Sequence, residues 1–153
     1  MNIPEVDLAY AAGIVDGEGS IVAHVAEGLY GHQTMAHVTV ANTNFELVEW
    51  FRITFGGRVK PLKIRNKRCK IVYQWIISSK DEIKEFLILV RPYLKVKSEQ
   101  ARFMLILVEN IGYRGIAEKD KMKIVKKEIL VEKLHDLNKR GVDQESEVED
   151  GFN

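Results

Sequence analysis

Ala11-Ala12-Gly13-Ile14-Val15-Asp16-Gly17-Glu18-Gly19 is the stretch that decides the fold, because it ends one predicted helix and leads directly into a predicted strand. Ala9, Gly13 and Gly17 recur every fourth residue and therefore stack along one helical face. A face without side-chain bulk fills a core poorly, but it lets a second helix approach closely. The sequence thus predicts a helix that packs against another helix through its backbone.

Two acids close this stretch, and we expect them to differ in role. Glu18 is predicted to lie just past the helix, where the glycines on both sides leave room for a metal ion and a phosphate. Asp16 is predicted to have a structural task at the helix end. Ala12 and Asp16 are expected beside the small-residue face.

Composition indicates one ordinary globular domain. The chain has 153 residues, of which 46% are hydrophobic and 29% charged, and its net charge is +1. No apolar run approaches the roughly 18 residues of a membrane span, and no basic and apolar leader opens the chain. Cys69 is the single cysteine, which suits a reducing compartment, and the histidines show no zinc-ligand spacing. We expect a protein that is not secreted, cytoplasmic in a prokaryote or organellar.

The charges are strongly segregated along the chain. Residues 1–51 contain seven acids and no Lys or Arg, whereas residues 52–80 contain nine bases and no acid. A basic block on one hairpin is typical of a surface that binds phosphates, although a solvated lysine-rich hairpin has the same composition. The residues from Asp143 onward carry five acids and no base, and we expect this tail to be disordered.

Hydrophobic periodicity predicts alternating helices and hairpins. Capping boxes at Thr43–Glu46 and Ser79–Glu82 indicate two helix starts, and Gly56-Gly57 indicates a helix end. The fourth helix is apolar nearly all round and should be buried. The fifth should bury a stripe of Met122, Val125, Ile129 and Leu134. The predicted elements are helix 6–16, strands 20–26 and 33–41, helix 43–55, strands 58–64 and 70–77, and helices 80–92, 99–111 and 120–138.

This order predicts an α+β fold with an α-β-β-α-β-β-α core, in which helices cover one face of an antiparallel sheet. Residues 1–142 form one domain, and 143–153 form the acidic tail. Period-two alternation places one set of strand residues on the uncovered face. These are Ser20, Val22, His24, Met35, His37, Thr39, Arg58, Lys60, Lys70, Val72 and Gln74.

Residues 11–19 resemble the motif of the LAGLIDADG homing endonucleases, intron- or intein-encoded enzymes that cut DNA, and of their maturase relatives. Six positions match identically or by close aliphatic exchange, Glu18 replaces an Asp, and Gly17 is a common variant. Ala11, where the family has Leu, is a departure. The resemblance spans about residues 8–112, which includes a family-like stretch of proline, apolar pair and lysines at 91–97.

The resemblance implies a homodimer, because family members with one motif pair whereas those with two motifs are monomers. Ala9, Ala12, Gly13 and Asp16 would form the dimer interface. The sheet would form a saddle on double-stranded DNA, covering a long, roughly palindromic site. Strand residues would read bases, with Arg58 and Lys60 suited to guanine, Gln74 to adenine and Val22 or Val72 to a thymine methyl group. The residues expected on phosphates are Lys63, Arg65, Lys67 and Arg68.

For catalysis, the resemblance implies that Glu18 and the carbonyl group of Gly17 hold Mg²⁺ or Mn²⁺, with Ca²⁺ as a substitute that does not support cleavage. Lys97 would reach the active site as a cation near the scissile phosphate. Asn42 occupies the position of a family glutamine that orients water, although its shorter side chain leaves this role open.

Two other classes of function remain open from the sequence. A relative could keep the nucleic-acid surface as an RNA-splicing maturase or a DNA-binding regulator without cutting. The presence of both Glu18 and Lys97 favours the nuclease. A phosphate or calcium site at 16–19 is the weakest reading, because an EF-hand needs more ligands and a phosphate loop precedes a helix.

Overall fold

A computed structural model describes residues 2–28, 31–63, 69–112 and 118–139. The predicted phosphate-binding residues Arg65, Lys67 and Arg68, together with the acidic tail at 143–153, lie outside the described residues. Within the described ranges, none of the helices combines the length and apolarity that a bilayer crossing requires.

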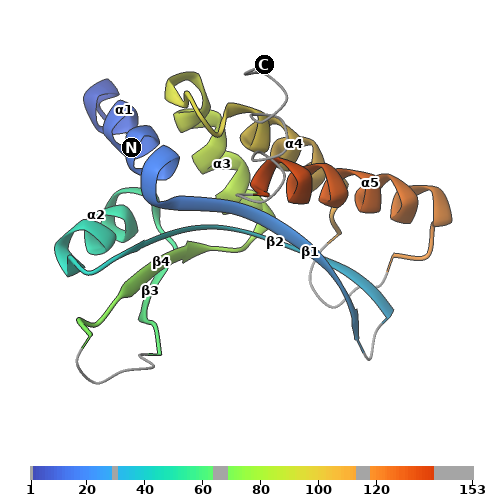
Figure 1. Cartoon of the computed structure of the whole chain (residues 1–153). Helices are drawn as coiled ribbons and strands as arrows, with labels where there is room; N and C mark the ends of the chain where they lie inside the picture. Colours follow the sequence, from blue (N-terminus) through green and yellow to red (C-terminus); the bar gives the residue numbers. More distant parts are fainter. Residues whose placement is uncertain (1, 29–30, 64–68, 113–117, 140–153) are drawn as a thin grey trace, which may run out of the picture.

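Figure 1 shows a curved sheet with the helices on one side of it. The element order is α1 (Glu5–Glu18), β1 (Gly19–Gly28), β2 (Gly31–Asn42), α2 (Phe45–Phe55), β3 (Arg58–Pro61), β4 (Tyr73–Ile77), α3 (Lys80–Val90), the 3-10 turn η1 (Arg91–Tyr93), α4 (Ser98–Asn110) and α5 (Lys121–Asn138). The predicted α+β class and order of elements are therefore confirmed.

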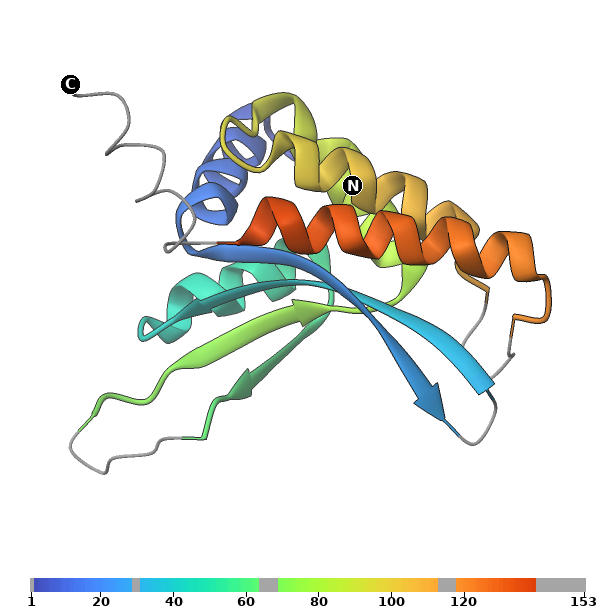
Figure 2. The same ribbon diagram turned by 45° about the vertical axis from the view of Figure 1, so that its right-hand side comes forward.

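The sheet has the strand order β1-β2-β4-β3, and every neighbouring pair is antiparallel. The two hairpins thus join through β2 and β4, with β1 and β3 at the edges. Figure 2 shows the sheet arching away beneath the helices, so that its second face is left uncovered. β3 and β4 are shorter than the predicted 58–64 and 70–77, although Leu62 N–H still donates to the Val72 carbonyl at 2.8 Å.

The core lies between the sheet and the helices. Trp75 of β4 packs against Phe51 of α2 and Phe86 of α3, with ring centroids 4.9 and 5.2 Å away. The Trp75 indole N–H donates to the Gly56 carbonyl at 2.8 Å, so this buried polar group is satisfied. Gly57 has a φ of 80°, and a Cβ there would lie 2.6 Å from Ile77, so this turn requires glycine.

Two helix starts show how far the capping predictions hold. Ser79 caps α3 as predicted: its Oγ accepts from Glu82 N–H at 3.2 Å and lies 2.8 Å from the Glu82 carboxylate. The predicted cap at Thr43 is wrong, because Asn44 caps α2 by accepting from Leu47 N–H at 3.2 Å. The side-chain oxygen of Asn44, one residue after Thr43, reaches the first turn of the helix, so α2 begins at Phe45.

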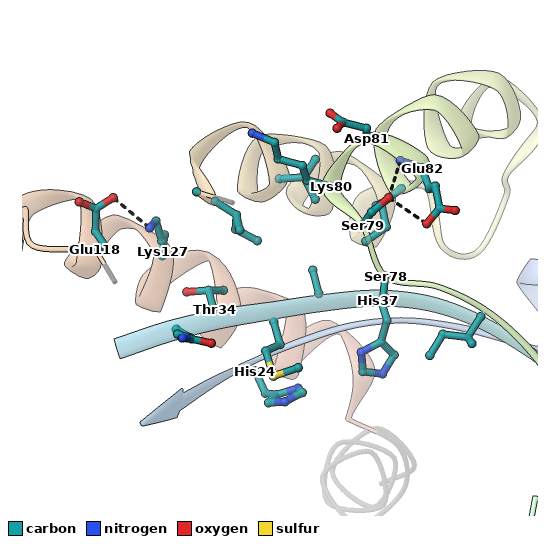
Figure 3. A pocket seen from close by; sticks show the side chains of 18 of the residues that line it. His24, Thr34, His37, Ser78, Ser79, Lys80, Asp81, Glu82, Glu118 and Lys127 are labelled. Atoms are coloured by element: carbon teal, nitrogen blue, oxygen red, sulfur yellow. Dashed lines mark hydrogen bonds and ion pairs between the residues drawn. The ribbon is translucent and has the colours of Figure 1, made fainter. Parts of the chain in front are cut away.

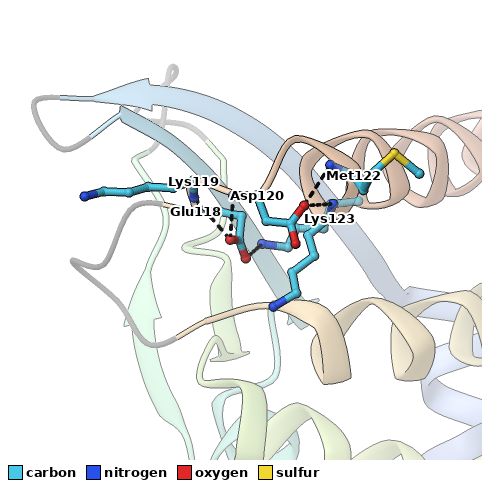
Figure 4. A network of polar contacts seen from close by, with 6 residues as sticks. Glu118, Lys119, Asp120, Met122 and Lys123 are labelled. Atoms are coloured by element: carbon cyan, nitrogen blue, oxygen red, sulfur yellow. Dashed lines mark hydrogen bonds and ion pairs between the residues drawn. The ribbon is translucent and has the colours of Figure 1, made fainter.

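The predicted buried stripe of α5 is largely wrong. Met122, Val125 and Ile129 are exposed, and the buried residues are Lys127, Leu130, Val131 and Leu134. Lys127 is buried because its ammonium group pairs with Glu118 at 3.2 Å. Figure 4 shows the polar contacts at this helix start, where Asp120 accepts from the backbone N–H groups of Met122 and Lys123.

The other end of α5 covers the open edge of β1. The His135 imidazole lies 3.0 Å from the Ala23 carbonyl, and the Asn138 amide donates to the Ile21 carbonyl at 2.9 Å. These contacts satisfy carbonyl groups that no strand pairs, which protects the edge from pairing with another chain. They also fix the C-terminal end of α5 beside the start of β1.

Candidate functional site

The end of α1 passes into β1 without a connecting loop. Glu18 is the last residue of the helix, rather than just past it as predicted, and Gly19 is the first residue of the strand. A Cβ at Gly19 would lie 2.7 Å from both the Cα and the carbonyl oxygen of Val15, so only glycine fits this junction. Gly17 and Glu18 are exposed, and the junction therefore presents the Glu18 carboxylate to the outside of the protomer.

Asp16 fastens the chain segment before α4 to the end of α1. Its Oδ2 accepts from Lys95 N–H at 2.7 Å, and its Oδ1 accepts from Lys97 N–H at 2.9 Å. Both carboxylate oxygens are thus used inside the protomer. This agrees with the structural task predicted for Asp16 at the helix end, and its place in a dimer interface stays a prediction.

Lys97 is brought to the same place from 81 positions later in the sequence. Only 6% of its surface is exposed, and its Nζ donates to the Asp16 carbonyl at 2.5 Å. The C-terminal end of a helix carries partial negative charge, which favours a cation there. The structure therefore holds an ammonium group two residues from Glu18 along the α1 backbone.

Asn42 ends β2 at the same end of the sheet. Val40 pairs with Gly19, so Asn42 lies two positions beyond the start of β1. Its Oδ1 accepts from Asn44 N–H at 2.9 Å and forms a local turn into α2. That oxygen is therefore engaged in the turn, and the catalytic role of Asn42 stays a prediction.

The end of α1 offers oxygen ligands rather than a cluster of metal-binding side chains. Within the described ranges, no group of three or more His, Cys, Asp or Glu residues is placed to hold a metal ion. The oxygen donors present at the end of α1 are the exposed Glu18 carboxylate and backbone carbonyl groups. Oxygen donors of this kind suit Mg²⁺, which keeps several other ligands from water and phosphate.

The small-residue face of α1 is exposed, as the spacing of Ala9, Gly13 and Gly17 predicts. A Cβ at Gly13 or Gly17 would meet nothing within 4 Å, so packing inside the protomer does not require glycine at either position. Ala12 is not part of this face, because it is completely buried in its own protomer. The side chain of Ala12 is therefore not available to the predicted interface, whereas Ala9 and Gly13 are exposed and remain candidates for it.

Strand register assembles the predicted reading residues on the uncovered face. Residues directly opposite in an antiparallel pair share a face, and alternate residues along a strand do too. Ser20, Thr39, Ile76 and Arg58 form one row across the four strands. The other rows contain Val22 with His37, His24 with Met35, and Gln74 with Lys60.

Some residues predicted to contact DNA differ from the others in exposure or in their position relative to the strands. Thr39 lies on this face but is only 7% exposed, which contradicts its role as a reading side chain. Lys63, Lys70 and Val72 lie beyond the ends of β3 and β4, and both lysines are exposed. Gln33 also belongs to this face, opposite Ala26, and was missed although the alternation from His37 and Met35 leads to it.

Two neighbouring histidines lie on this face of the sheet, and their environment affects the protonation of one of them. The rings of His24 and His37 have centroids 6.0 Å apart, and both project away from the helices in Figure 3. Partial burial lowers the pKa of His37 below its usual value, and the charges of His24 and Lys60 lower it further. At neutral pH, His37 is therefore an uncharged donor and acceptor.

A cavity of about 570 Å³ opens along the part of β2 that no other strand covers. β4 pairs with β2 only from Val38 onward, so residues 31–37 have one open edge. The cavity runs from His24 and His37 on one side to Thr34 and Lys127 on the other (Figure 3).

Comparison with known proteins relates this arrangement to DNA-cutting enzymes. DNA endonuclease I-CreI from Chlamydomonas reinhardtii is 29% identical over 105 residues, which are 68% of this chain and 63% of that protein. The chain thus matches less than two thirds of this relative's length. No protein-family profile matches the sequence.

Solved structures share the fold. Homing endonuclease I-CvuI, in complex with its target in the presence of calcium, superposes with a TM-score of 0.75 over 90% of this chain and 85% of its own, at 22% identity. The archaeal intron-encoded homing endonuclease I-Vdi141I, complexed with DNA, has a TM-score of 0.74 over 90% and 87%, at 16% identity. The sequence similarity to I-CreI and the fold shared with I-CvuI and I-Vdi141I thus relate this chain to homing endonucleases, in agreement with the resemblance of its residues 11–19 to the LAGLIDADG motif.

Proposed function

We propose that this protein is a site-specific homing endonuclease that binds a long, pseudo-palindromic DNA site as a homodimer and hydrolyses one phosphodiester on each strand. One observation carries the proposal: the exposed glycine face of α1 ends in an exposed carboxylate, directly beside an uncovered face of polar and basic strand residues. The chain thus passes directly from the surface proposed for dimerisation to the acid and then to the surface proposed to bind DNA.

The dimer forms through α1 of each protomer. Ala9, Gly13 and Gly17 allow two helices to pack backbone against backbone. A two-fold axis through this contact brings the two copies of Glu18 to the same place, and it supplies from the partner the acid that one protomer lacks. Each protomer then reads one half of the site.

The sheet matches the dimensions of DNA. β1 and β2 have 10 and 12 residues. At about 3.3 Å per residue, these strands are roughly 33–40 Å long, which is about one helical turn of the duplex. A two-stranded ribbon fits the major groove, where polar side chains distinguish all four base pairs.

At the cleavage site, Glu18 from each protomer and the Gly17 carbonyl group would hold Mg²⁺. When bound, the ion lowers the pKa of water and stabilises charge on the scissile phosphate. The oxygen of a water molecule attacks phosphorus and loses a proton to solvent, the bond from phosphorus to the leaving oxygen breaks, and the leaving oxygen takes up a proton from solvent. Lys97 holds positive charge at the end of α1, where it attracts the phosphate and opposes the negative charge of the acids.

The proposal is tested by incubating the protein with a library of long DNA duplexes in Mg²⁺ and sequencing the cut ends. Recurrent breaks in both strands at one pseudo-palindromic sequence are expected. Ca²⁺ in place of Mg²⁺ should give binding to the same sequence without breaks. Specific binding without breaks in Mg²⁺ would instead indicate a DNA-binding regulator, and binding to structured intron RNA alone would indicate a maturase.

A further inference from the structure

We infer that His24, Met35 and His37 form a site for a soft transition-metal ion, copper(I), on the uncovered face of the sheet. This site is separate from the acids at the end of α1, and it uses a different class of ligand. Its three side chains come from two neighbouring strands, β1 and β2.

Strand register brings the three side chains together. Met35 lies directly opposite His24, and His37 lies opposite Val22, so the two histidines are diagonal neighbours on one face. Met35 and His37 are two residues apart on the same strand and share that face. All three line the same cavity. The result is a triangle of two imidazoles and one thioether.

The spacing of the two rings fits a shared ion. An imidazole nitrogen ligates a metal at about 2.0–2.1 Å, so two rings that share one ion have centroids roughly 5–6 Å apart. The observed separation of 6.0 Å is at the upper end of this range, and both rings project from the same side of the strands (Figure 3). The separation of the rings therefore permits both imidazoles to bind one ion.

The ligand types select the ion. Thioether sulfur and imidazole suit copper, whereas magnesium and calcium require oxygen ligands. The paired strand residues that share this face include no Asp or Glu, and its charged side chains are those of Arg58 and Lys60. Because these cations repel a divalent ion more than a monovalent one, the environment favours copper(I).

The proposed copper site lies on the surface proposed to bind DNA, so its effect on DNA binding rests on the proposed function. An ion held by His24 and His37 withdraws both imidazoles from base contacts. Copper(I) should therefore weaken DNA binding, because the ion and the DNA compete for the same two side chains.

The test is an anaerobic titration with copper(I) against a competing chromophoric chelator, without DNA. A Cys69→Ser background removes the exposed thiol, which is itself a copper ligand. We expect one copper(I) per protomer. His24→Asn and His37→Asn should each weaken the affinity for copper(I) at least about tenfold. A tenfold change corresponds to a loss of ~1.4 kcal/mol of binding free energy. Met35→Leu, which keeps the volume of the side chain, should weaken it less.

His32→Asn is the matched control, because His32 lies on the helix-covered side, where it contacts Glu128 of α5. This variant should bind copper(I) as the parent does. Absence of binding by the parent overturns the site, as does equal binding by the His24, His37 and parent proteins, or loss of binding in the His32 variant. Circular dichroism of each variant checks that the fold is retained.

A second measurement separates this inference from the proposed function. Fluorescence anisotropy with a long duplex of mixed sequence at low salt should show weaker binding when copper(I) is added to the parent, but not to His37→Asn. Failure to bind DNA at all would contradict the endonuclease while leaving the copper titration intact. Equal DNA affinity with and without copper(I) would refute the competition.

Discussion

The buried ammonium group of Lys97 donates a hydrogen bond to the backbone carbonyl of Asp16, while the Asp16 carboxylate accepts the backbone N–H of Lys97 at 2.9 Å. This reciprocal pair joins the segment before α4 to the end of α1, next to Glu18. Asp16→Ala removes the acceptor of two backbone N–H groups, those of Lys95 and Lys97. Because hydrogen bonds to a charged group contribute about 1.5–3 kcal/mol each, we expect the variant to lose about 3 kcal/mol of unfolding free energy in urea denaturation.

Lys97→Met keeps most of the buried volume but removes the charge, so its effect should appear in cleavage. We expect slower cutting at unchanged DNA affinity, measured in single-turnover reactions with saturating protein. Lys95→Met is the control, since Lys95 is exposed and bonds to Asp16 through its backbone. A rate for Lys97→Met equal to that of Lys95→Met would exclude a role for the Lys97 ammonium group in cleavage.

Glu18→Gln should abolish cleavage and leave specific binding largely intact. The amide is close in size to the carboxylate but carries no charge, so it removes affinity for Mg²⁺ without touching the reading face. The measurement is a cleavage time course beside a binding titration in Ca²⁺. Cutting at the parental rate would end the assignment of Glu18 as the catalytic acid.

Gly13→Leu should dissociate the dimer while the protomer stays folded. The helix has open space at this position, whereas the proposed contact with a second α1 has none. Sedimentation velocity should show the monomer. Gly19→Ala is the contrasting variant: its methyl group would meet the backbone of Val15 at 2.7 Å, so the fold itself should lose about 1–3 kcal/mol. A Gly13→Leu protein that sediments as a dimer would refute the pairing through α1.

Stability should fall with acidification through the range of histidine titration. The folded state lowers the pKa of His37, so below the ordinary pKa of histidine the unfolded chain binds more protons than the folded one. Folding stability contributed by the neutral ring is therefore present above that pKa and is lost as pH decreases toward the folded pKa. His37→Asn should flatten this part of the profile of unfolding free energy against pH, measured from pH 5 to 8 with urea. A parental slope in the variant would assign the effect to other groups.

DNA affinity should depend steeply on salt. Each phosphate contact made by a lysine or arginine contributes about 0.9 to the slope of log affinity against log salt. Lys63→Gln, which changes an exposed residue expected on a phosphate, should reduce the slope by about 1, as measured by fluorescence anisotropy over a range of salt concentrations. A slope near zero in the parent would contradict binding through the basic hairpin.

Much of the fold could be predicted because local signals agreed with the tertiary structure. Alternation in β1 and β2 gave the buried and uncovered faces, and the four-residue spacing of Ala9, Gly13 and Gly17 gave the exposed face of α1. The face of α5 could not be predicted, because apolar residues occur on both sides of that helix. Burial of Lys127 depends on its ion pair with Glu118, which lies outside the helix. The periodicity of residues within α5 therefore cannot predict this burial.

The sequence could propose candidate site residues, but it could not predict the contacts that they make. The motif identified Glu18 and Asp16, yet the bonds from Lys95 and Lys97 to Asp16 span about 80 positions and have no local signature. Thr39 satisfied the alternation but lies in a row between Ser20 and Ile76 that leaves its side chain little access to solvent. Strand position determines the direction of a side chain, whereas its exposure depends on the neighbouring strands.

Because α1 passes directly from Glu18 into β1 at Gly19, the acid proposed to bind the metal ion and Ser20, the first residue proposed to contact a base, belong to one continuous segment of regular structure. Because no loop separates α1 from β1, neither an insertion in a loop nor the flexing of a loop can change the distance between these two residues. If the protein is the proposed endonuclease, substitutions in its strands can change the target sequence, whereas the backbone sets the interval between the cut and the recognised bases.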